Sequence, residues 1–169
     1  MLKMPERPKR IVINTGPLIS LIAGLGDLTL LEKLYKEVIV PYEVKQEMLS
    51  AGKEEFGARV FYNNNWLNKL DTSTSINSFL ANSLDKGEAS VIQVALDKEI
   101  NTVCIDETVG RRVARLNNLS VIGSLGIIIF GIKNGEDINL EDVIKNMREN
   151  GIWISKNLEK EAKRLVKKI

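Results

Sequence analysis

The chain has 169 residues, one cysteine and no histidine, and its 24 basic and 22 acidic side chains leave a formal net charge of +2. One cysteine excludes an internal disulfide and a thiolate metal cluster, and the missing histidine excludes Ser-His-Asp and Cys-His catalysis and every zinc site that needs imidazole. Proton transfer or metal binding must therefore depend on carboxylates, amides, hydroxyls, lysines or water.

Short strand-like runs alternate with helical patterns, which is typical of a parallel sheet with helical connections. The predicted strands are residues 11–13, 38–40, 66–70 (as an edge strand), 102–105 and 120–122. The predicted helices cover residues 18–25 (ended by glycines 24 and 26), 27–34 (with Asp27 as N-cap), 42–49, part of 53–65, 85–98, 106–118, an apolar helix after Gly123, and two amphipathic helices around 140–147 and 158–169. The order of these elements predicts an α/β fold.

Length and composition fit one domain over residues 1–169, in which residues 1–10 form a loosely ordered basic tail. The longest apolar run is too short to span a bilayer, and the start of the chain lacks the apolar stretch of a signal peptide. The single cysteine suits a reducing compartment, so we expect a cytoplasmic protein.

Polar side chains follow two of the best predicted strands. Asn14 comes directly after Ile13, and Asp106 follows the run that ends at Ile105. In open α/β sheets ligands bind outside the carboxyl ends of the strands, so parallel neighbours would bring both side chains into one crevice. Glu47 follows the second strand, and Glu88 lies in the first turn of the helix that enters the 102–105 strand.

Each of these residues has a structural alternative that the sequence leaves open. Asp106 could cap the following helix, and Asn14 before Thr-Gly-Pro could form an Asx-turn. Asp85 and Glu88 resemble a capping box, and Glu47 alone is typical of a solvated helix residue. Glu88, however, shares a helix face with apolar residues, and a carboxylate on a core-facing stripe needs a partner.

A cluster of carboxylates in one crevice repels itself unless cations or bases neutralise it. Hard oxygen ligands favour Mg²⁺ or Mn²⁺, and such ions bind phosphates and lower the pKa of bound water without any histidine. The residue inventory therefore favours metal-assisted phosphodiester hydrolysis.

Basic residues near the predicted crevice could bind the substrate. Arg111, Arg112 and Arg115 follow Asp106 closely enough to meet phosphates, as backbone contacts to single-stranded RNA require. The lysines and Arg164 of the last helix are interpreted as a solvated face, and Cys104 as a core residue. Gly24-Leu25-Gly26 is no dinucleotide fingerprint, and a phosphate-binding Gly-Lys-Ser/Thr loop is missing.

Four segments of the sequence resemble the PIN-domain family, in particular its toxin-like prokaryotic branch. They are Ile11-Val-Ile-Asn-Thr-Gly-Pro-Leu-Ile19, Val40-Pro-Tyr-Glu-Val-Lys-Gln-Glu47, Leu84-Asp-Lys-Gly-Glu-Ala-Ser-Val-Ile92 and Ile105-Asp-Glu-Thr-Val-Gly-Arg-Arg112. The similarity extends into Gly123-Ser-Leu-Gly126 and Asn150-Gly-Ile-Trp-Ile-Ser155. It runs over almost the whole chain.

The resemblance implies a Rossmann-like α/β/α sandwich with a parallel sheet of about five strands, and a Mg²⁺- or Mn²⁺-dependent endoribonuclease site. Asp106 and Asn14 would hold the metal most directly, Glu88 would complete the shell, and Glu47 would act through water or a second metal. Asn14 stands where the family has its first aspartate, so one negative charge is missing. Gly16 stands where many relatives carry a hydroxyl, and the adjacent Thr15 is assigned to substrate binding with the three arginines.

Two functions follow from these patterns. The first is a PIN-type endoribonuclease, the toxin of a toxin–antitoxin pair, which acts on single-stranded RNA and pairs with itself and with a small antitoxin protein. The second, motivated by Asn14, is a catalytically weakened module that binds RNA or a protein partner. The sequence does not separate RNA cleavage from DNA cleavage.

Overall fold

The computed structural model describes residues 10–50, 52 and 55–168. The predicted basic tail lies outside the described residues, apart from Arg10, which is the first residue of a strand. Within the described part of the chain, no helix is both long enough and apolar enough to cross a membrane.

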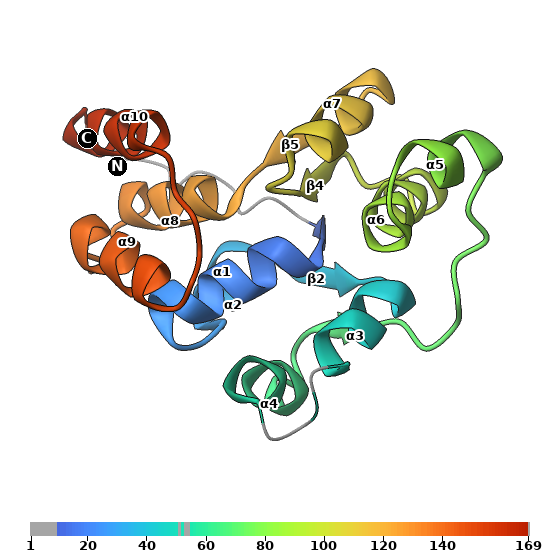
Figure 1. Cartoon of the computed structure of the whole chain (residues 1–169), viewed down its shortest axis with the longest axis horizontal. Coiled ribbons are helices and arrows are strands. Elements are labelled where there is room, and N and C mark those ends of the chain that lie inside the picture. The colour runs from blue at the N-terminus through green and yellow to red at the C-terminus, as the bar shows by residue number, and fades with distance from the viewer. Residues whose placement is uncertain (1–9, 51, 53–54, 169) are drawn as a thin grey trace, which may run out of the picture.

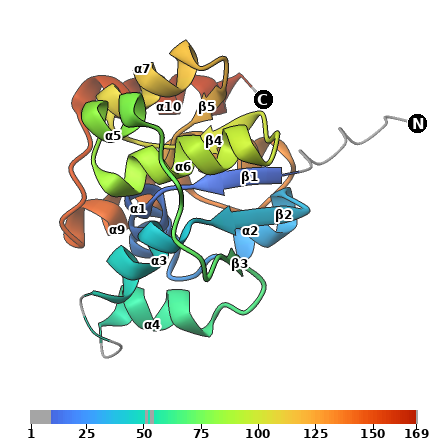
Figure 2. The same ribbon diagram turned by 90° about the vertical axis from the view of Figure 1, so that its right-hand side faces the viewer.

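Five parallel strands form one sheet in the order β3-β2-β1-β4-β5. They are β1 (Arg10–Ile13), β2 (Glu37–Val40), β3 (Asn68–Lys69), β4 (Thr102–Cys104) and β5 (Ser120–Ile122). Figure 2 shows β1 and β2 running in the same direction, toward the side of the molecule where α1 and α3 lie. The five-stranded parallel sheet expected from the sequence is confirmed.

The central strands are apolar on both faces because helices cover both sides of the sheet. Residues 11–13 of β1 and 38–40 of β2 are completely buried. Such unbroken apolar runs are typical of parallel strands inside an α/β sandwich. The edge strand β3 is short and polar, which discourages pairing with another chain.

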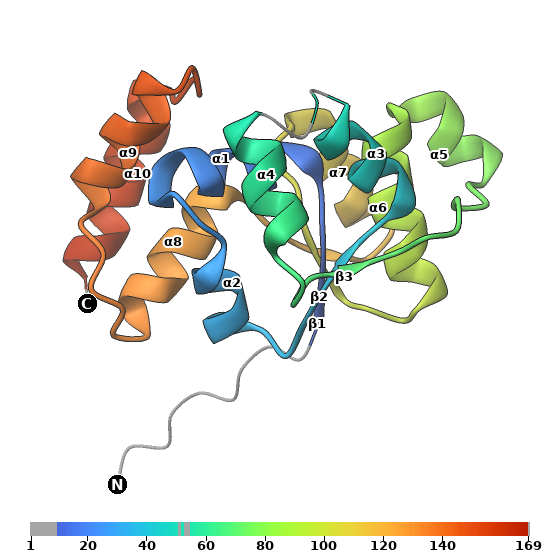
Figure 3. The same cartoon turned by 90° about the horizontal axis from the view of Figure 1, so that it is seen from below.

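The ten described helices pack in layers around the sheet. Their bounds are α1 (Thr15–Leu25), α2 (Thr29–Leu34), α3 (Tyr42–Leu49), α4 (Phe56–Asn63), α5 (Ser78–Ser83), α6 (Lys86–Asp97), α7 (Thr108–Leu116), α8 (Ser124–Lys133), α9 (Leu140–Glu149) and α10 (Lys156–Lys167). Figure 3 shows α1, α2 and α8 on one side of the sheet and α6 and α7 on the other. In Figure 1, α9 and α10 form an outer layer, where α9 packs on α1 and α10 packs on α8. The architecture is the predicted α/β/α sandwich.

Some predicted boundaries were wrong for identifiable reasons. Gly24 lies inside α1, and only Gly26 ends that helix, with a φ of 83°. Asp27 does not occupy the N-cap of α2; that residue is Leu28, although Oδ1 of Asp27 accepts a hydrogen bond from the Thr29 N–H at 3.0 Å. Helix α5 was missed because one buried residue, Leu80, leaves no apolar stripe to detect.

The predicted strand and helix around Asp106 are shorter than expected. β4 ends at Cys104, and α7 begins at Thr108 with Glu107 as its N-cap. Of the predicted edge strand 66–70, only Asn68 and Lys69 form the strand β3, although the N–H of Leu70 also donates to the carbonyl of Val40 at 2.9 Å. Asp106 therefore lies in a short connection, where its side chain is not committed to a helix.

We expect Gly24→Ala to lower the free energy of unfolding by about 1 kcal/mol, because a Cβ at this position would lie 2.8 Å from Cγ1 of Val143 and 3.0 Å from Cε of Met147 on α9. Gly57→Ala in α4 is the matched control. Its Cβ would meet nothing within 4 Å, so the better helix former should raise stability by up to about 1 kcal/mol. Urea denaturation measures both, and equal effects would contradict the close packing of α1 on α9.

Candidate active site

The carboxyl ends of β1 and β4 define the candidate site. The chain passes from β1 to β2 on one side and returns to β4 on the other, so β1 and β4 flank the point where the strand order reverses. Ligands bind at this point in open α/β sheets. The N–H of Asn14 donates to the carbonyl of Cys104 at 3.0 Å, which extends the pairing one residue past β1. Asn14 and Asp106 therefore follow neighbouring strands, as predicted.

Asn14 is 6% exposed and occupies the N-cap position of α1, yet its side chain makes no capping hydrogen bond. Its Oδ1 is buried and has no hydrogen-bond partner among the described residues. The Asx-turn alternative is therefore wrong. A buried amide oxygen without a partner is costly and rare, and a water molecule or a cation is a common reason for one.

Asp106 is exposed and accepts two hydrogen bonds from one residue on another element. Its Oδ1 accepts from the N–H of Ser124 at 2.7 Å, and its Oδ2 accepts from the hydroxyl of Ser124 at 2.9 Å. Ser124 is the first residue of α8, where unpaired N–H groups and the helix dipole favour a carboxylate. The alternative that Asp106 caps the following helix is wrong, because Glu107 is the N-cap of α7.

Glu88 is 7% exposed and lies in the first turn of α6. Its N–H donates to Oδ1 of Asp85 at 2.9 Å, which confirms that Asp85 caps this helix. Burial, together with the nearby carboxylates of Asp85 and Glu107, raises the pKa of the Glu88 carboxyl to about 7. A buried acid with a raised pKa is poised to exchange its proton for a cation.

Glu47 lies on the exposed side of α3 and is held by the residue that follows Asn14. The hydroxyl of Thr15 donates to Oε2 of Glu47 at 2.6 Å. The Glu47 carboxylate also lies against Gly87, in the first turn of α6, so close that a Cβ there would collide with it. Glu47 is therefore not a freely solvated helix residue, because α1, α3 and α6 together position it.

Each of the three predicted acids lies against a glycine. Gly87 faces Glu47, and a Cβ at Gly110 would lie 2.9 Å from Oε1 of Glu88. A Cβ at Gly123 would lie 2.9 Å from Oδ1 of Asp106. Any larger residue at these glycines would displace the acid, so the glycines leave room for carboxylates around the carboxyl ends of the strands.

The donor atoms are all oxygens, which fits a hard divalent cation such as Mg²⁺ or Mn²⁺. Across residues 10–50, 52 and 55–168, no three acidic, cysteine or histidine side chains lie close enough to form a metal site by themselves. The amide oxygen of Asn14 and water molecules would have to complete the shell, and Mg²⁺ in proteins commonly keeps several waters. With that addition the residues present fit the cation.

Sequence reasoning missed Ser124 and the three glycines. Gly123-Ser124 directly after a strand was a usable signal, because a serine at the start of a helix presents both an N–H and a hydroxyl. Glu43, the other acid after β2, is buried and accepts hydrogen bonds from the N–H of Thr74 at 2.6 Å and its hydroxyl at 2.8 Å. These bonds give Glu43 a structural role.

The three arginines of α7 separate into two groups. Arg111 is half-buried, and its Nη1 donates to the carbonyl of Ile105 at 2.9 Å. A Cβ at Gly123 would lie 2.9 Å from that Nη1 as well as from Oδ1 of Asp106, so the guanidinium and the carboxylate flank the same glycine. Arg112 and Arg115 are exposed on the outer face of the helix. The structure therefore places only Arg111 beside Asp106.

Comparisons with known proteins agree with this geometry. A family model described as a PIN domain matches residues 10–168. No curated protein and no solved structure matches the chain. PIN domains are generally nucleases and usually use divalent metals, so the fold is of a nuclease type. Because the matched residues include all five strands and all ten described helices, the chain belongs to the PIN-domain family.

Proposed function

We propose that this chain is a metal-dependent endoribonuclease that hydrolyses phosphodiester bonds of single-stranded RNA, and that it is the toxin of a toxin–antitoxin pair. One observation carries the proposal. Three acids, each seated against a glycine, surround the carboxyl ends of β1 and β4, where the buried Oδ1 of Asn14 has no partner among the described residues. A small antitoxin protein and a second copy of the chain are the partners that this proposal includes.

Asn14, Glu88 and Asp106 are the residues that would hold the cation. A bound Mg²⁺ or Mn²⁺ supplies a water of lowered pKa and a positive charge for phosphate oxygens. The chain contributes an amide oxygen that is already desolvated and a carboxylate oriented by Ser124. It also contributes a buried carboxyl whose raised pKa favours the neutral form until a cation replaces the proton.

The remaining residues orient the substrate and water. The Thr15 hydroxyl holds Glu47 in place, and that carboxylate can accept a proton from a water molecule at the mouth of the site. Arg111 is anchored by the Ile105 carbonyl and presents its guanidinium beside Asp106, where it can pair with a phosphate. These roles need no histidine, in keeping with the composition.

A second candidate is a catalytically weakened module that binds RNA or a protein partner. It is favoured by Asn14, which removes one negative charge from the site. It is also favoured because the described residues contain no preassembled group of three acids. Fewer charged ligands weaken cation binding, so this alternative predicts a site that does not fill at cellular metal concentrations.

We expect Asp106→Asn to lower metal-dependent cleavage of single-stranded RNA by about a hundred-fold or more, because a charged ligand is worth several kcal/mol in the transition state. Asparagine keeps an oxygen that can accept from the Ser124 N–H, so the melting temperature without metal should change little. Glu32→Gln, on the exposed face of α2, is the matched control and should cleave normally. Undiminished cleavage by Asp106→Asn would exclude the proposed site.

We expect Asn14→Asp to tighten Mn²⁺ binding by about ten-fold, because it restores a negative charge where the amide oxygen now lies. In EDTA the same variant should melt at a lower temperature than the wild type, since a buried carboxylate without a partner is unfavourable. Calorimetry with Mn²⁺ and thermal melts measure both effects. If affinity and cleavage do not change, residue 14 does not contact the cation.

We expect the metal-free wild type to lose stability relative to Glu88→Gln as the pH rises from about 5 to about 8. The pKa of Glu88 in the folded state is about 7, above its ordinary value of 4.5. The folded chain therefore binds the proton more tightly than the unfolded chain, which stabilises the fold at low pH. This stabilisation is lost as the pH rises from 4.5 toward 7. The difference in unfolding free energy should change by on the order of 1 to 3 kcal/mol. Chemical denaturation in EDTA measures it, and a difference independent of pH would show that Glu88 is not the group titrating.

A further inference from the structure

Trp153 has a large apolar side chain that is exposed to solvent because the residues on either side of it are anchored. It is 84% exposed, whereas Ile154 is 7% exposed and Ile152 packs against the core. Arg148 pins this connection between α9 and α10, since its Nη2 donates to the carbonyl of Ile154 at 3.2 Å and to Oε2 of Glu159 at 2.5 Å. Successive side chains from Ile152 to Ile154 point alternately toward the core and toward solvent. Because the backbone of this segment is anchored, the indole of Trp153 is fixed on the solvent side.

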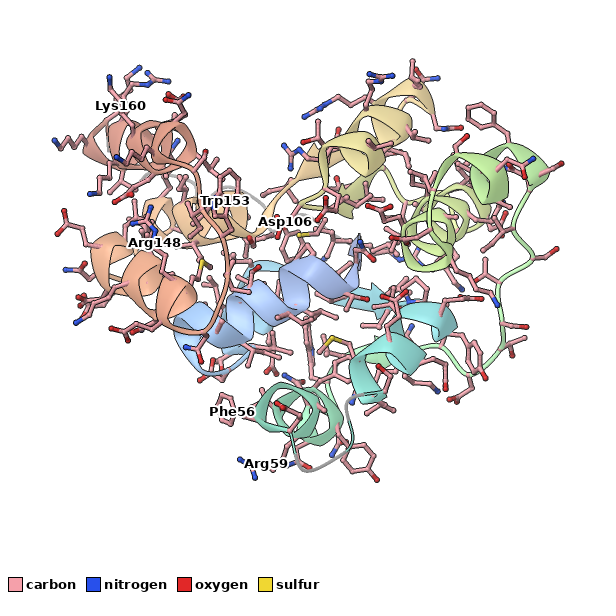
Figure 4. The ribbon with its side chains drawn as sticks, viewed as in Figure 1. Phe56, Arg59, Asp106, Arg148, Trp153 and Lys160 are labelled. Atoms are coloured by element: carbon pink, nitrogen blue, oxygen red, sulfur yellow. The ribbon has the colours of Figure 1, made fainter. Side chains whose placement is uncertain are left out.

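A hollow of about 720 Å³ joins Trp153 to the candidate active site. Asp106, Arg111 and Ser124 line one part of it, and Trp153 lines another. Figure 4 shows Trp153 between Asp106 and α10. Since pockets of roughly 300 to 1,000 Å³ hold small ligands, this hollow has room for a nucleotide unit next to the acidic site.

Trp153 also lines a second hollow, of about 630 Å³. Arg148 and Lys156 lie there. The indole therefore lines both a hollow that contains Asp106 and Arg111, and a hollow in which Arg148 is paired with Glu159 and Lys156 is the other basic residue. A flexible chain with flat rings and regularly spaced negative charges matches this sequence of surfaces.

We propose that Trp153 is a base-stacking subsite, on which one unpaired base of a single-stranded RNA lies while an adjoining phosphate reaches Arg111. This inference rests on the proposed nuclease function, because that function is the reason to expect the RNA strand to pass Asp106. Only an unpaired base can offer its face to the indole, because bases within a duplex are already stacked on one another. Arg111 is preorganised for the phosphate by its hydrogen bond to the Ile105 carbonyl.

The test is the binding of a fluorescein-labelled single-stranded RNA of about 10 nucleotides, a length within the site sizes of single-strand-binding proteins. Fluorescence anisotropy in EDTA measures affinity without cleavage. Trp153→Ala should weaken binding by about five- to a hundred-fold, the range that loss of one base–aromatic stack produces, and Trp153→Phe should retain most of the affinity. Phe79→Ala, at an exposed aromatic on α5, is the matched control and should bind as the wild type does.

A second readout reports on the indole directly. The chain has two tryptophans, so Trp66→Phe leaves Trp153 as the only source of indole fluorescence. RNA should quench this fluorescence, and a duplex of the same length should quench it much less.

The outcomes separate this inference from the proposed function. Unchanged RNA affinity of Trp153→Ala would overturn the stacking subsite, even if the wild type cleaves RNA. Binding that depends on Trp153 without any cleavage would support the subsite and contradict the nuclease. A wild type that binds no single-stranded RNA overturns the subsite. A change of molecular mass in light scattering for Trp153→Ala, with no change in RNA affinity, would instead identify a protein interface.

Discussion

The hydrogen bond from the Asn14 N–H to the Cys104 carbonyl is the contact on which the site depends. It joins two segments ninety residues apart in the chain and aligns the carboxyl ends of β1 and β4. These strands are buried on both faces, so a shift of register would expose apolar residues and is strongly disfavoured. Asn14 and Asp106 consequently follow neighbouring strands at the point where the strand order reverses, and the acids from α3 and α6 gather around them.

Hydrogen bonds and a raised pKa reduce the repulsion among the acids of the site. Asp106 is satisfied by the first residue of α8, and Glu47 by the Thr15 hydroxyl. Glu88 is buried, and its raised pKa means that it can carry a proton near neutral pH. Among the fully buried side-chain nitrogen and oxygen atoms of the described residues, only Oδ1 of Asn14 has no hydrogen-bond partner, so an unmet polar group and a buried acid both lie in the site.

Much of the fold could be predicted from the sequence, because its strongest signals are local. The β-branched runs around Val12 and Ile39 became central strands, and α3 has the predicted bounds Tyr42–Leu49. The errors occurred where a distant contact decided the outcome. Gly24 stays helical because α9 packs closely against it, and α5 has too few buried residues to show a helical stripe.

Some features of the candidate site could likewise be predicted from the sequence, and others depend on contacts between distant residues. The sequence alone determined the chemistry open to this protein, because a chain without histidine and with one cysteine must work with oxygen donors and basic side chains. It also indicated which acids follow the strands. Only the tertiary structure decided that Ser124 holds Asp106, that glycines admit the carboxylates, and that Trp153 faces the hollow of the site. Those contacts join separate elements, and their geometry depends on how whole helices and strands pack rather than on any local pattern.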